Sequence, residues 1–342
     1  MKVEKWVTFA AAAILCLAPI GSLYGAEKVV GGMGGGRALS NAGIYIAVNK
    51  GYFKAQGIEW EGRLFKSAAD TVPLLGAGQL DVATGAPSAG LINAVARGID
   101  MRIVADKGSL RKGTDFHGLV MRKDLVDAGR YKGPADLKGL KIAIAARGVV
   151  PDYTLGVWAK RGGLKLSDVN FIIIGPGDIP AGLTNKAFDG AVVWEPIKTL
   201  LVERGIGVLA ERTEDTMPDL MTASLIYSAK FAKERKEAAI RFMVAYLQGN
   251  RDYTDAIFKK DDKKRAEVID ILVKESDVKD PAMIAKLGSV WLDPNGEMNK
   301  ESVKDMQDFW FSQGLVKEKV DVDRLLDESF YREAVKRIGR YQ

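Results

Sequence analysis

The chain has almost no cysteine and almost no histidine, with one residue of each among 342. No disulfide bond can therefore form within the chain, and cysteine and histidine cannot build a zinc site in it. A Ser-His-Asp hydrolase would have to use His117, and a lone histidine in an expected crossover strand is more often structural than catalytic. A metal or acid/base site made of carboxylates alone stays possible on these counts, but we expect no catalytic residue, no metal and no cofactor.

A large excess of either charge is also missing. Lysine and arginine number 50 against 44 aspartate and glutamate residues, a formal net charge of +6, and the signs are mixed along the chain. No basic block carries interleaved aromatic residues, which disfavours nucleic-acid binding. With 47% hydrophobic and 27% charged residues, the composition is globular and excludes a disordered, collagen-like or multi-span membrane protein. The length predicts two domains or one domain of two lobes.

The N-terminus has the order of regions found in a secretory signal peptide. Two lysines precede an apolar run over 6–20, and small residues follow it up to Ala26. The run is shorter than the ~20 residues of a membrane-spanning helix, so we expect cleavage near Ala26 and no permanent anchor. Leu15 stands where a lipoprotein signal requires a small residue, so lipid anchoring at Cys16 is disfavoured.

Downstream, short apolar runs alternate with segments of helical periodicity, and glycine or proline marks the boundaries. Strands are expected at 28–31, 58–65, 80–84, 100–105, 118–122, 140–145, 170–174, 190–194 and 222–227. Helices are expected at 39–50, 68–75, 89–97, 153–160, 179–185, 231–258, 263–275, 281–286, 300–313 and 322–337. This alternation predicts an α/β fold of mostly parallel sheets covered by helices.

Several short motifs follow one another at a characteristic spacing. They are Lys50-Gly51-Tyr52-Phe53, Phe65-Lys66-Ser67-Ala68-Ala69-Asp70, Gly78-Gln79-Leu80-Asp81-Val82, Gly85-Ala86-Pro87-Ser88, Val95-Ala96-Arg97-Gly98, Asp136-Leu137-Lys138-Gly139-Leu140-Lys141-Ile142-Ala143 and Ala191-Val192-Val193-Trp194-Glu195-Pro196. In these motifs the sequence resembles the extracytoplasmic solute-binding proteins of the nitrate, sulfonate, taurine and thiamine-pyrimidine importers. The resemblance runs from about Val30 to about Gly207, and the helical C-terminal third fits it more loosely.

The resemblance implies a two-lobe clamshell of the periplasmic binding protein type II, with mixed sheets flanked by helices. The expected organisation is a signal peptide at 1–26, lobe one at 27–115 plus 223–342, and lobe two at 116–222. The function implied is the substrate-binding component of an ABC importer, which captures a small organic solute (a sulfonate, carboxylate or pyrimidine-like molecule) in the interlobe cleft. The partners would be the permease and its ATPase, and the chain would be a periplasmic monomer that meets the membrane only through the permease.

Two other functions remain open. An enzyme on the same fold, such as a pyrimidine synthase or a menaquinone-pathway dehydratase, is disfavoured because the synthase pattern requires a cysteine-rich iron motif and an active histidine. Both enzyme types are also cytoplasmic, which conflicts with a signal peptide. A binding protein that serves a membrane sensor instead of a permease would show the same sequence features.

Candidate ligand contacts lie at the carboxyl ends of expected strands, where helix N-termini present unpaired N–H groups. In lobe one, Gly85 and Ala86 leave room for a ligand, and Pro87-Ser88 suits the start of a helix. The alternative for this motif is a plain helix cap. In lobe two, Trp194 would stack on a ligand and Glu195 would accept its hydrogen bonds. The alternative there is a packed tryptophan and a glutamate favoured by the helix dipole.

The remaining candidates are Arg37, Asn41, Ser67, Ser109, Arg147 and Tyr153. Arg37 and Arg147 would neutralise an anionic ligand, although a solvated surface position is more common for each. Asp152, beside Tyr153, is expected to be an N-cap. The glycine run at 31–36 lacks G-x-G-x-x-G spacing, so nucleotide binding is disfavoured and a loop that admits a small ligand is expected.

Overall fold

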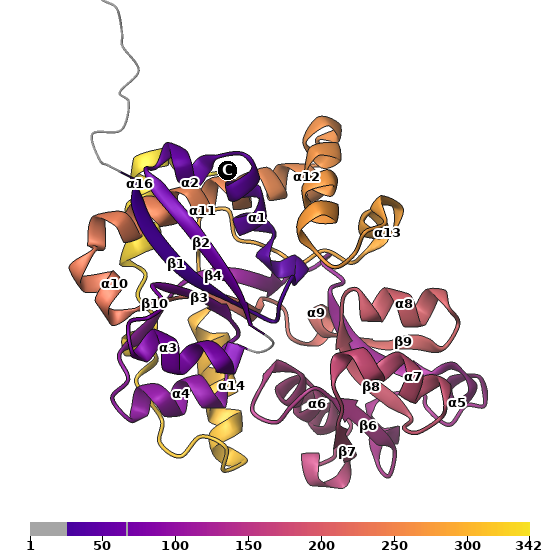
Figure 1. The fold of residues 1–342 in the computed structure, drawn as a ribbon. Coiled ribbons are helices and arrows are strands. Elements are labelled where there is room, and N and C mark those ends of the chain that lie inside the picture. Colours follow the sequence, from indigo (N-terminus) through magenta and orange to yellow (C-terminus); the bar gives the residue numbers. More distant parts are fainter. Residues whose placement is uncertain (1–25, 66–67) are drawn as a thin grey trace, which may run out of the picture.

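The computed structural model describes residues 26–65 and 68–342 and contains two five-stranded mixed sheets, each flanked by helices (Figure 1). The α/β class with mixed sheets is thereby confirmed. The expected signal peptide, apart from Ala26, and the candidate Ser67 lie outside the described residues.

The first sheet has the strand order β2-β1-β3-β10-β4, in which β10 runs antiparallel to both β3 and β4. Its strands are β1 (Glu27–Gly34), β2 (Ile58–Phe65), β3 (Val82–Gly85), β4 (Met101–Leu110) and β10 (Leu220–Ser228). Its helices are η1 (Leu39–Asn41), α1 (Ala42–Asn49), α2 (Tyr52–Ala55), α3 (Val72–Gly76), α4 (Ala89–Ala96), α10 (Ala229–Glu234), α11 (Lys236–Ile257), α12 (Asp262–Glu275), α13 (Pro281–Lys286), α14 (Lys300–Ser312), α15 (Val322–Leu325) and α16 (Ser329–Ile338). We call this sheet with these helices lobe one.

The second sheet has the order β7-β6-β8-β5-β9, in which β5 runs antiparallel to both β8 and β9. Its strands are β5 (His117–Arg122), β6 (Lys141–Ile144), β7 (Asn170–Ile173), β8 (Gly190–Trp194) and β9 (Gly207–Arg212). Its helices are α5 (Lys123–Asp127), α6 (Val150–Arg161), α7 (Ile179–Thr184), α8 (Ile197–Glu203) and α9 (Thr213–Thr216). We call this sheet with these helices lobe two.

Three of the differences from the sequence-based expectation have a clear structural cause. Strand β9 is not predicted by its residues, because it is a half-buried edge strand with little apolar alternation. The helix expected at 231–258 is divided into α10 and α11 by Arg235, whose φ and ψ of −126° and 39° are not helical. The helix expected at 322–337 is divided into α15 and α16, because Leu326 leaves the helix to form a β-bridge with Ile103 of β4.

Lobe one is built around the buried helix α11. Phe242 of α11 packs against Phe53 and Trp60, with ring centroids 4.7 and 5.3 Å away. Gly31 of β1 is needed for this arrangement, since a Cβ atom there would lie 1.7 Å from the Trp60 ring. The aromatic cluster packs β1 and β2 against α11, and so positions the end of β1 and the loop that follows it.

The chain passes between the sheets twice, between β4 and β5 and between β9 and β10. The strand that follows each passage is the antiparallel one of its sheet. Helices α1 and α4 in lobe one, and α6 in lobe two, each start beside the other lobe (Figure 1). The topology therefore brings helix-start loops from both lobes to one boundary.

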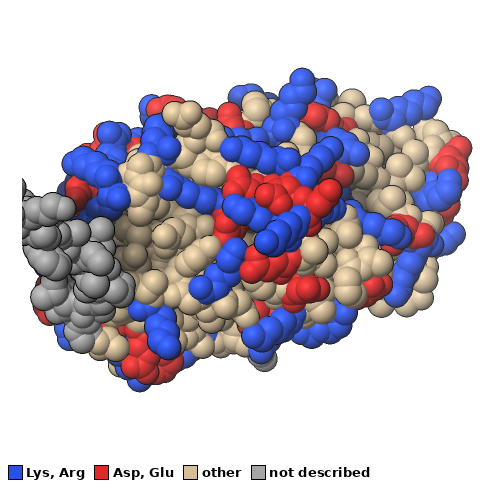
Figure 2. Space-filling view, turned by 90° about the horizontal axis from the view of Figure 1, so that it is seen from above, with Lys and Arg blue, Asp and Glu red and all other residues tan. Residues whose placement is uncertain are grey.

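The surface carries both charge signs. Figure 2 shows lysine and arginine side chains interspersed with acidic ones across the face drawn, with uncharged residues between them. In the part of the chain that the structure describes, no helix combines the length and the hydropathy needed to cross a bilayer.

Candidate ligand-binding site

The two lobes touch through the loops that start α4 and α6. The backbone N–H of Ala89 in lobe one donates to the carbonyl oxygen of Gly148 in lobe two over 2.9 Å. Gly148 has a φ of +71°, and a Cβ atom there would lie 2.9 Å from the Cβ of Ala89. Ser88 caps α4, because its Oγ accepts from the N–H of Leu91 at 3.2 Å. The Gly85-Ala86-Pro87-Ser88 loop therefore lies at the boundary between the lobes.

A buried carboxylate holds the facing loop of lobe two. Asp152 is fully buried, and its Oδ2 accepts from the N–H of Gly148 at 2.9 Å. Its Oδ1 lies 2.8 Å from Nε of Arg147, whose guanidinium also covers the ring of Phe171 at 4.8 Å. Burial raises the pKa of Asp152, and the Gly148 N–H and Arg147 oppose that rise. The N-cap of α6 is Val149, so the expectation that Asp152 is the N-cap is wrong.

Tyr153 belongs to the packing between the lobes. Its ring meets Phe309 of α14 edge to face, with centroids 5.4 Å apart. Gly156, one turn further along α6, faces the same ring, and a Cβ atom there would lie 2.3 Å from it. Burial raises the pKa of Tyr153 to about 12, so its hydroxyl stays protonated.

Trp194 stacks on the single histidine. His117 and Trp194 are paired in register between β5 and β8, and their rings lie 6.4 Å apart at an angle of 12°. Nδ1 of His117 lies 2.7 Å from Oγ1 of Thr213, and Nε2 is buried without a hydrogen-bond partner among the described residues. Burial lowers the pKa of His117 to about 3, which keeps the ring neutral at physiological pH. The half-buried Trp194 therefore rests on an uncharged ring.

Glu195 is engaged by protein groups on every side. Its Oε1 accepts from the backbone N–H of Gly288 at 2.9 Å and from Oγ1 of Thr199 at 2.8 Å. Its Oε2 accepts from the N–H of Thr199, and Nζ of Lys198 lies 3.0 Å from Oε1. The structure thus uses this buried carboxylate to fasten α8 to the segment after α13, and leaves it little capacity for a ligand.

Asn41 lies beside a cation that the sequence analysis misses. Its buried Oδ1 accepts from Nζ of Lys107 on β4 at 3.0 Å, and Nζ also donates to Oγ of Ser40 at 2.9 Å. The side-chain amide of Asn41 donates to the carbonyl oxygen of Gly36 at 3.3 Å. Burial lowers the pKa of Lys107 to about 7. No sequence signal marks Lys107, because the strand expected at 100–105 ends before it and its burial follows from the longer strand β4.

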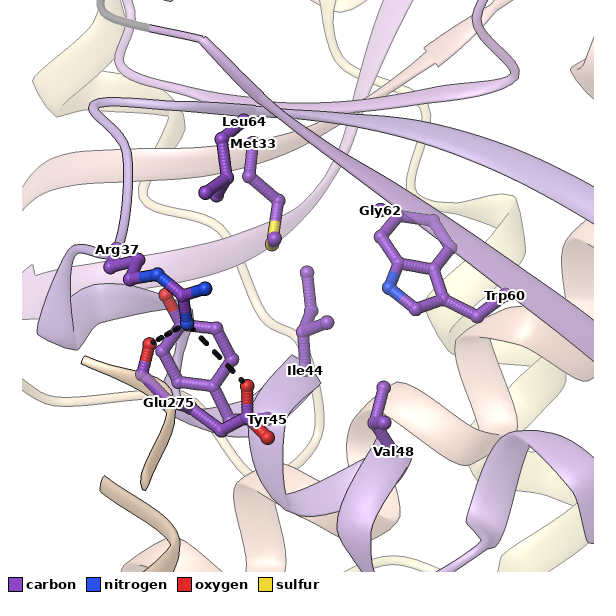
Figure 3. Close-up of a pocket in the computed structure, with 9 residues that line it drawn as sticks. All are labelled: Met33, Arg37, Ile44, Tyr45, Val48, Trp60, Gly62, Leu64 and Glu275. Atoms are coloured by element: carbon purple, nitrogen blue, oxygen red, sulfur yellow. Dashed lines mark hydrogen bonds and ion pairs between the residues drawn. The ribbon is translucent and has the colours of Figure 1, made fainter. Parts of the chain in front are cut away.

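Arg37 turns away to α12. Its Nη1 donates to the carbonyl oxygen of Glu275 at 3.0 Å and lies 4.0 Å from that residue's Oε2. Figure 3 shows Arg37 and Glu275 at one end of a hollow of about 250 Å³. The hollow is lined by Met33, Arg37, Ile44, Tyr45, Val48, Trp60, Gly62, Leu64 and Glu275. Its walls come from β1, β2, α1 and α12, so this hollow belongs to lobe one alone.

Ser109 serves the packing between β4 and the segment that follows α13. Its Oγ donates to Oδ1 of Asp106 at 2.5 Å, and its backbone pairs with Trp291 in both directions. The structure therefore gathers the 85–88 loop, Arg147 and Tyr153 near the contact between the lobes. Glu195 bonds to Gly288 of lobe one, and Arg37 and Ser109 are engaged within lobe one. Contact of any of them with a ligand stays a prediction.

Known proteins share this sequence pattern and fold. The chain is 26% identical over 221 residues to a protein of Brucella abortus (strain 2308) named "Putative binding protein", and this match covers 62% of each chain. The chain thus spans about three fifths of the length of that relative. It is 23% identical over 306 residues to the "Putative aliphatic sulfonates-binding protein" of Bacillus subtilis (strain 168), covering 85% of this chain and 84% of the relative.

A solved structure shows the same architecture. The crystal structure of the periplasmic nitrate-binding protein of Synechocystis PCC 6803 is similar with a TM-score of 0.73 and 19% sequence identity, over 91% of this chain and 89% of the other. The two-lobe fold of periplasmic binding proteins is thereby confirmed. The NMT1-like family matches residues 26–273, more than half of the chain. The chain therefore belongs to the NMT1-like family.

Proposed function

We propose that the protein is the extracytoplasmic substrate-binding component of an ABC importer. It captures a small organic solute (a sulfonate, a carboxylate or a pyrimidine-like molecule) between its lobes and delivers it to the permease and its ATPase. The observation that carries this proposal is the hydrogen bond from Ala89 to Gly148, which joins two helix-start loops from different lobes. The names of the sulfonate-binding and nitrate-binding relatives support it.

The geometry favours capture by lobe closure. A solute that contacts both lobes binds the closed arrangement more tightly than the open one. This difference in binding free energy is the amount by which the solute stabilises the closed arrangement. Both loops at the contact precede helix N-termini, whose partial positive charge attracts acceptor atoms. Micromolar affinity corresponds to about −8 kcal/mol, which a few hydrogen bonds and one stacked ring can supply.

The residues proposed to face the solute come from both lobes. They are Asn41, Gly85, Ala86, Pro87, Ser88, Arg147, Tyr153 and Trp194. The proposal includes no chemical step and no cofactor. It includes a periplasmic location after cleavage near Ala26, and a monomer that meets the membrane only through the permease.

A solute screen tests this function. The chain from residue 27 to 342 is purified, and its thermal unfolding is followed with taurine, simple carboxylates, aminopyrimidines and nitrate. A solute at 100 times its dissociation constant adds about 2.7 kcal/mol to the free energy of unfolding, which raises the melting temperature measurably. N-terminal sequencing of the exported protein checks the location, because a chain that keeps Met1 would contradict it.

Closure itself is tested by a matched pair of glycine substitutions. Gly148 and Gly163 have similar positive φ angles, +71° and +74°, but only a Cβ atom at Gly148 would meet the other lobe. Gly148→Ala should therefore weaken binding of the solute found in the screen by roughly tenfold, or about 1.4 kcal/mol, relative to Gly163→Ala. Equal affinities in the two variants would contradict binding by closure at this contact.

A further inference from the structure

Lys107 is a buried lysine whose Nζ forms no ion pair with a carboxylate among the described residues. Two lysines are buried among the described residues, Lys107 at 3% exposure and Lys198 at 4%. Lys198 pairs with Asp115 at 2.9 Å and with Glu195 at 3.0 Å. For Lys107, the described residues place no carboxylate oxygen within 4.0 Å of Nζ, and its two hydrogen-bond partners, Ser40 and Asn41, are neutral.

A β-bulge directs this side chain. Asp106 of β4 pairs with Ser224 of β10, and Gly108 pairs with Ala223. Ser224 and Ala223 are consecutive, so Lys107 has no partner on β10 and is the extra residue of the bulge. Bulges turn a side chain out of the regular alternation of a strand, and they occur often beside binding sites. Here the bulge points the ammonium to the residues immediately before α1, at the end of lobe one that faces lobe two (Figure 1).

The surroundings of this ammonium favour an anion. The N-terminus of α1 contributes partial positive charge, which adds to the lysine charge and does not offset it. Asp106, the neighbour on β4, directs its carboxyl oxygens to Oγ of Ser109 and the N–H of Asp293. Burying an unpaired cation costs free energy that two neutral acceptors recover only in part. A third ammonium hydrogen has no acceptor among the described residues.

A second polar group at the same edge of the sheet also lacks a partner. Thr84, near the end of β3, is fully buried, and its Oγ1 has no hydrogen-bond partner among the described residues. It precedes the Gly85-Ala86-Pro87-Ser88 loop at the contact between the lobes. Unpaired buried polar atoms are uncommon in proteins, and a bound water, ion or ligand group is one way to satisfy them.

We propose that the Lys107 ammonium, with Ser40 and the start of α1, forms the anion-binding part of the solute site. The solute carries a single anionic oxygen group, a carboxylate or a sulfonate, and directs it at lobe one. This inference rests on the proposed function and names the substrate class. A single cation matches a monoanion. Arg37 and Arg147 do not supply this contact, because Glu275 and Asp152 already engage them.

Matched probe pairs test the anion requirement by calorimetry. Butanesulfonate and butanoate are compared with the neutral butanesulfonamide and butanamide, on the wild-type chain, on Lys107→Met and on the control Lys54→Met, which removes an exposed lysine of the same lobe. The anions should bind wild type at least tenfold more tightly than their neutral counterparts. Lys107→Met should weaken anion binding at least thirtyfold and change binding of the neutral probes less than threefold. Lys54→Met should bind every probe as wild type does.

The outcomes separate this inference from the function on which it rests. Tight binding of a neutral probe to wild type, or anion binding retained in Lys107→Met, would overturn the anion site and leave solute binding intact. Binding of no probe at all would count against both. If Lys107→Met does not fold, the ¹³Cε resonance of Lys107 in the wild-type chain replaces it. That resonance should move on addition of butanesulfonate and not of butanesulfonamide, and the opposite result would overturn the inference.

Discussion

Asp152 and Glu195, the buried carboxylates near the facing edge of lobe two, are each bound by a backbone N–H group and by a cation of the same lobe. At the facing edge of lobe one, β4 carries the buried Lys107, whose hydrogen-bond partners are a hydroxyl and an amide oxygen. These two carboxylates of lobe two are thus paired with cations, whereas Lys107 of lobe one is hydrogen-bonded only to neutral groups.

This difference suggests a division of labour between the lobes. A carboxylate that holds a loop in place reduces the entropy lost when the loop meets a ligand, so lobe two contributes a preformed surface. An uncompensated buried charge gains much from an incoming counter-charge, so lobe one contributes the electrostatic preference. Each of the following substitutions changes a residue of one lobe and leaves the other lobe unaltered.

The largest effect is expected from Glu195→Ala. The substitution leaves the N–H of Gly288 and the hydroxyl of Thr199 without their buried acceptor, and removes one of the two carboxylates around Lys198. We expect the free energy of unfolding to fall by about 3 kcal/mol, measured by urea denaturation.

The control for this substitution is Glu203→Ala. Glu203 pairs with Lys286 at 2.9 Å on the surface, where both side chains are exposed. Loss of such a pair costs below about 1 kcal/mol. Equal losses in the two variants would show that Glu195 is not a brace of the lobe two edge.

Trp194→Ala should follow in size. The half-buried Trp194 stacks on His117, and a ligand that covers its ring would lose about 1–3 kcal/mol of binding free energy in the variant, with the fold retained. Trp158→Ala is the comparison, because Trp158 is fully buried and its removal should cost about 3–5 kcal/mol of stability. If Trp194→Ala unfolds as readily as Trp158→Ala and shows no separate binding defect, Trp194 is a core residue.

The alternation of strands and helices could be predicted from the sequence because it is local. Apolar runs, glycines and helix-start residues report on neighbours within a few positions. Strand β9 escapes this logic, because a half-buried edge strand needs few apolar residues. The order of the motifs, read together, was enough to indicate the family.

The partners of the site residues could not be predicted, because they are distant in the chain. In the sequence, Glu195 is a carboxylate at a helix start that is expected to be free to bind a ligand. In the structure it accepts a hydrogen bond from Gly288, 93 residues later. Lys107 lies just beyond the strand expected at 100–105, and its burial depends on a bulge against β10 and on Asn41, 66 residues earlier. Local patterns therefore locate the loops of the site and leave its charges unassigned.

A pH series measures the cost of the charge in lobe one. Burial lowers the pKa of Lys107 to about 7 from 10.5, so above pH 7 the unfolded chain holds a proton that the folded chain has lost. The free energy of unfolding of the wild type, minus that of Lys107→Met, should therefore rise between pH 8 and 10. The expected rise is up to about 1.4 kcal/mol per pH unit. Urea denaturation at pH 8, 9 and 10 measures this difference, and a constant difference would contradict the buried charge.

The neighbouring titratable groups do not confound this window. Burial raises the pKa of Asp106 to about 7, so above pH 8 its carboxyl is ionised in the folded chain, as it is in the unfolded chain. Burial also raises the pKa of Tyr45 to about 12 and that of Tyr246 well above its usual range, so both stay protonated. The slope is therefore assigned to Lys107.

The smallest effect is expected from Arg37→Met, the other cation near the loop after β1. Its guanidinium is exposed and is held by Glu275 in the hollow of Figure 3, so it contributes to a bound anion only through long-range attraction. At 0.15 M salt this attraction is screened beyond about 8 Å. Calorimetry with the best anionic solute should therefore show a change below about 0.5 kcal/mol, against a loss of at least thirtyfold in Lys107→Met. A loss of affinity in Arg37→Met as large as that in Lys107→Met would indicate that the anion binds at this exposed arginine and not in the interior of lobe one. The contrast between the two lobes would then no longer explain where the solute charge binds.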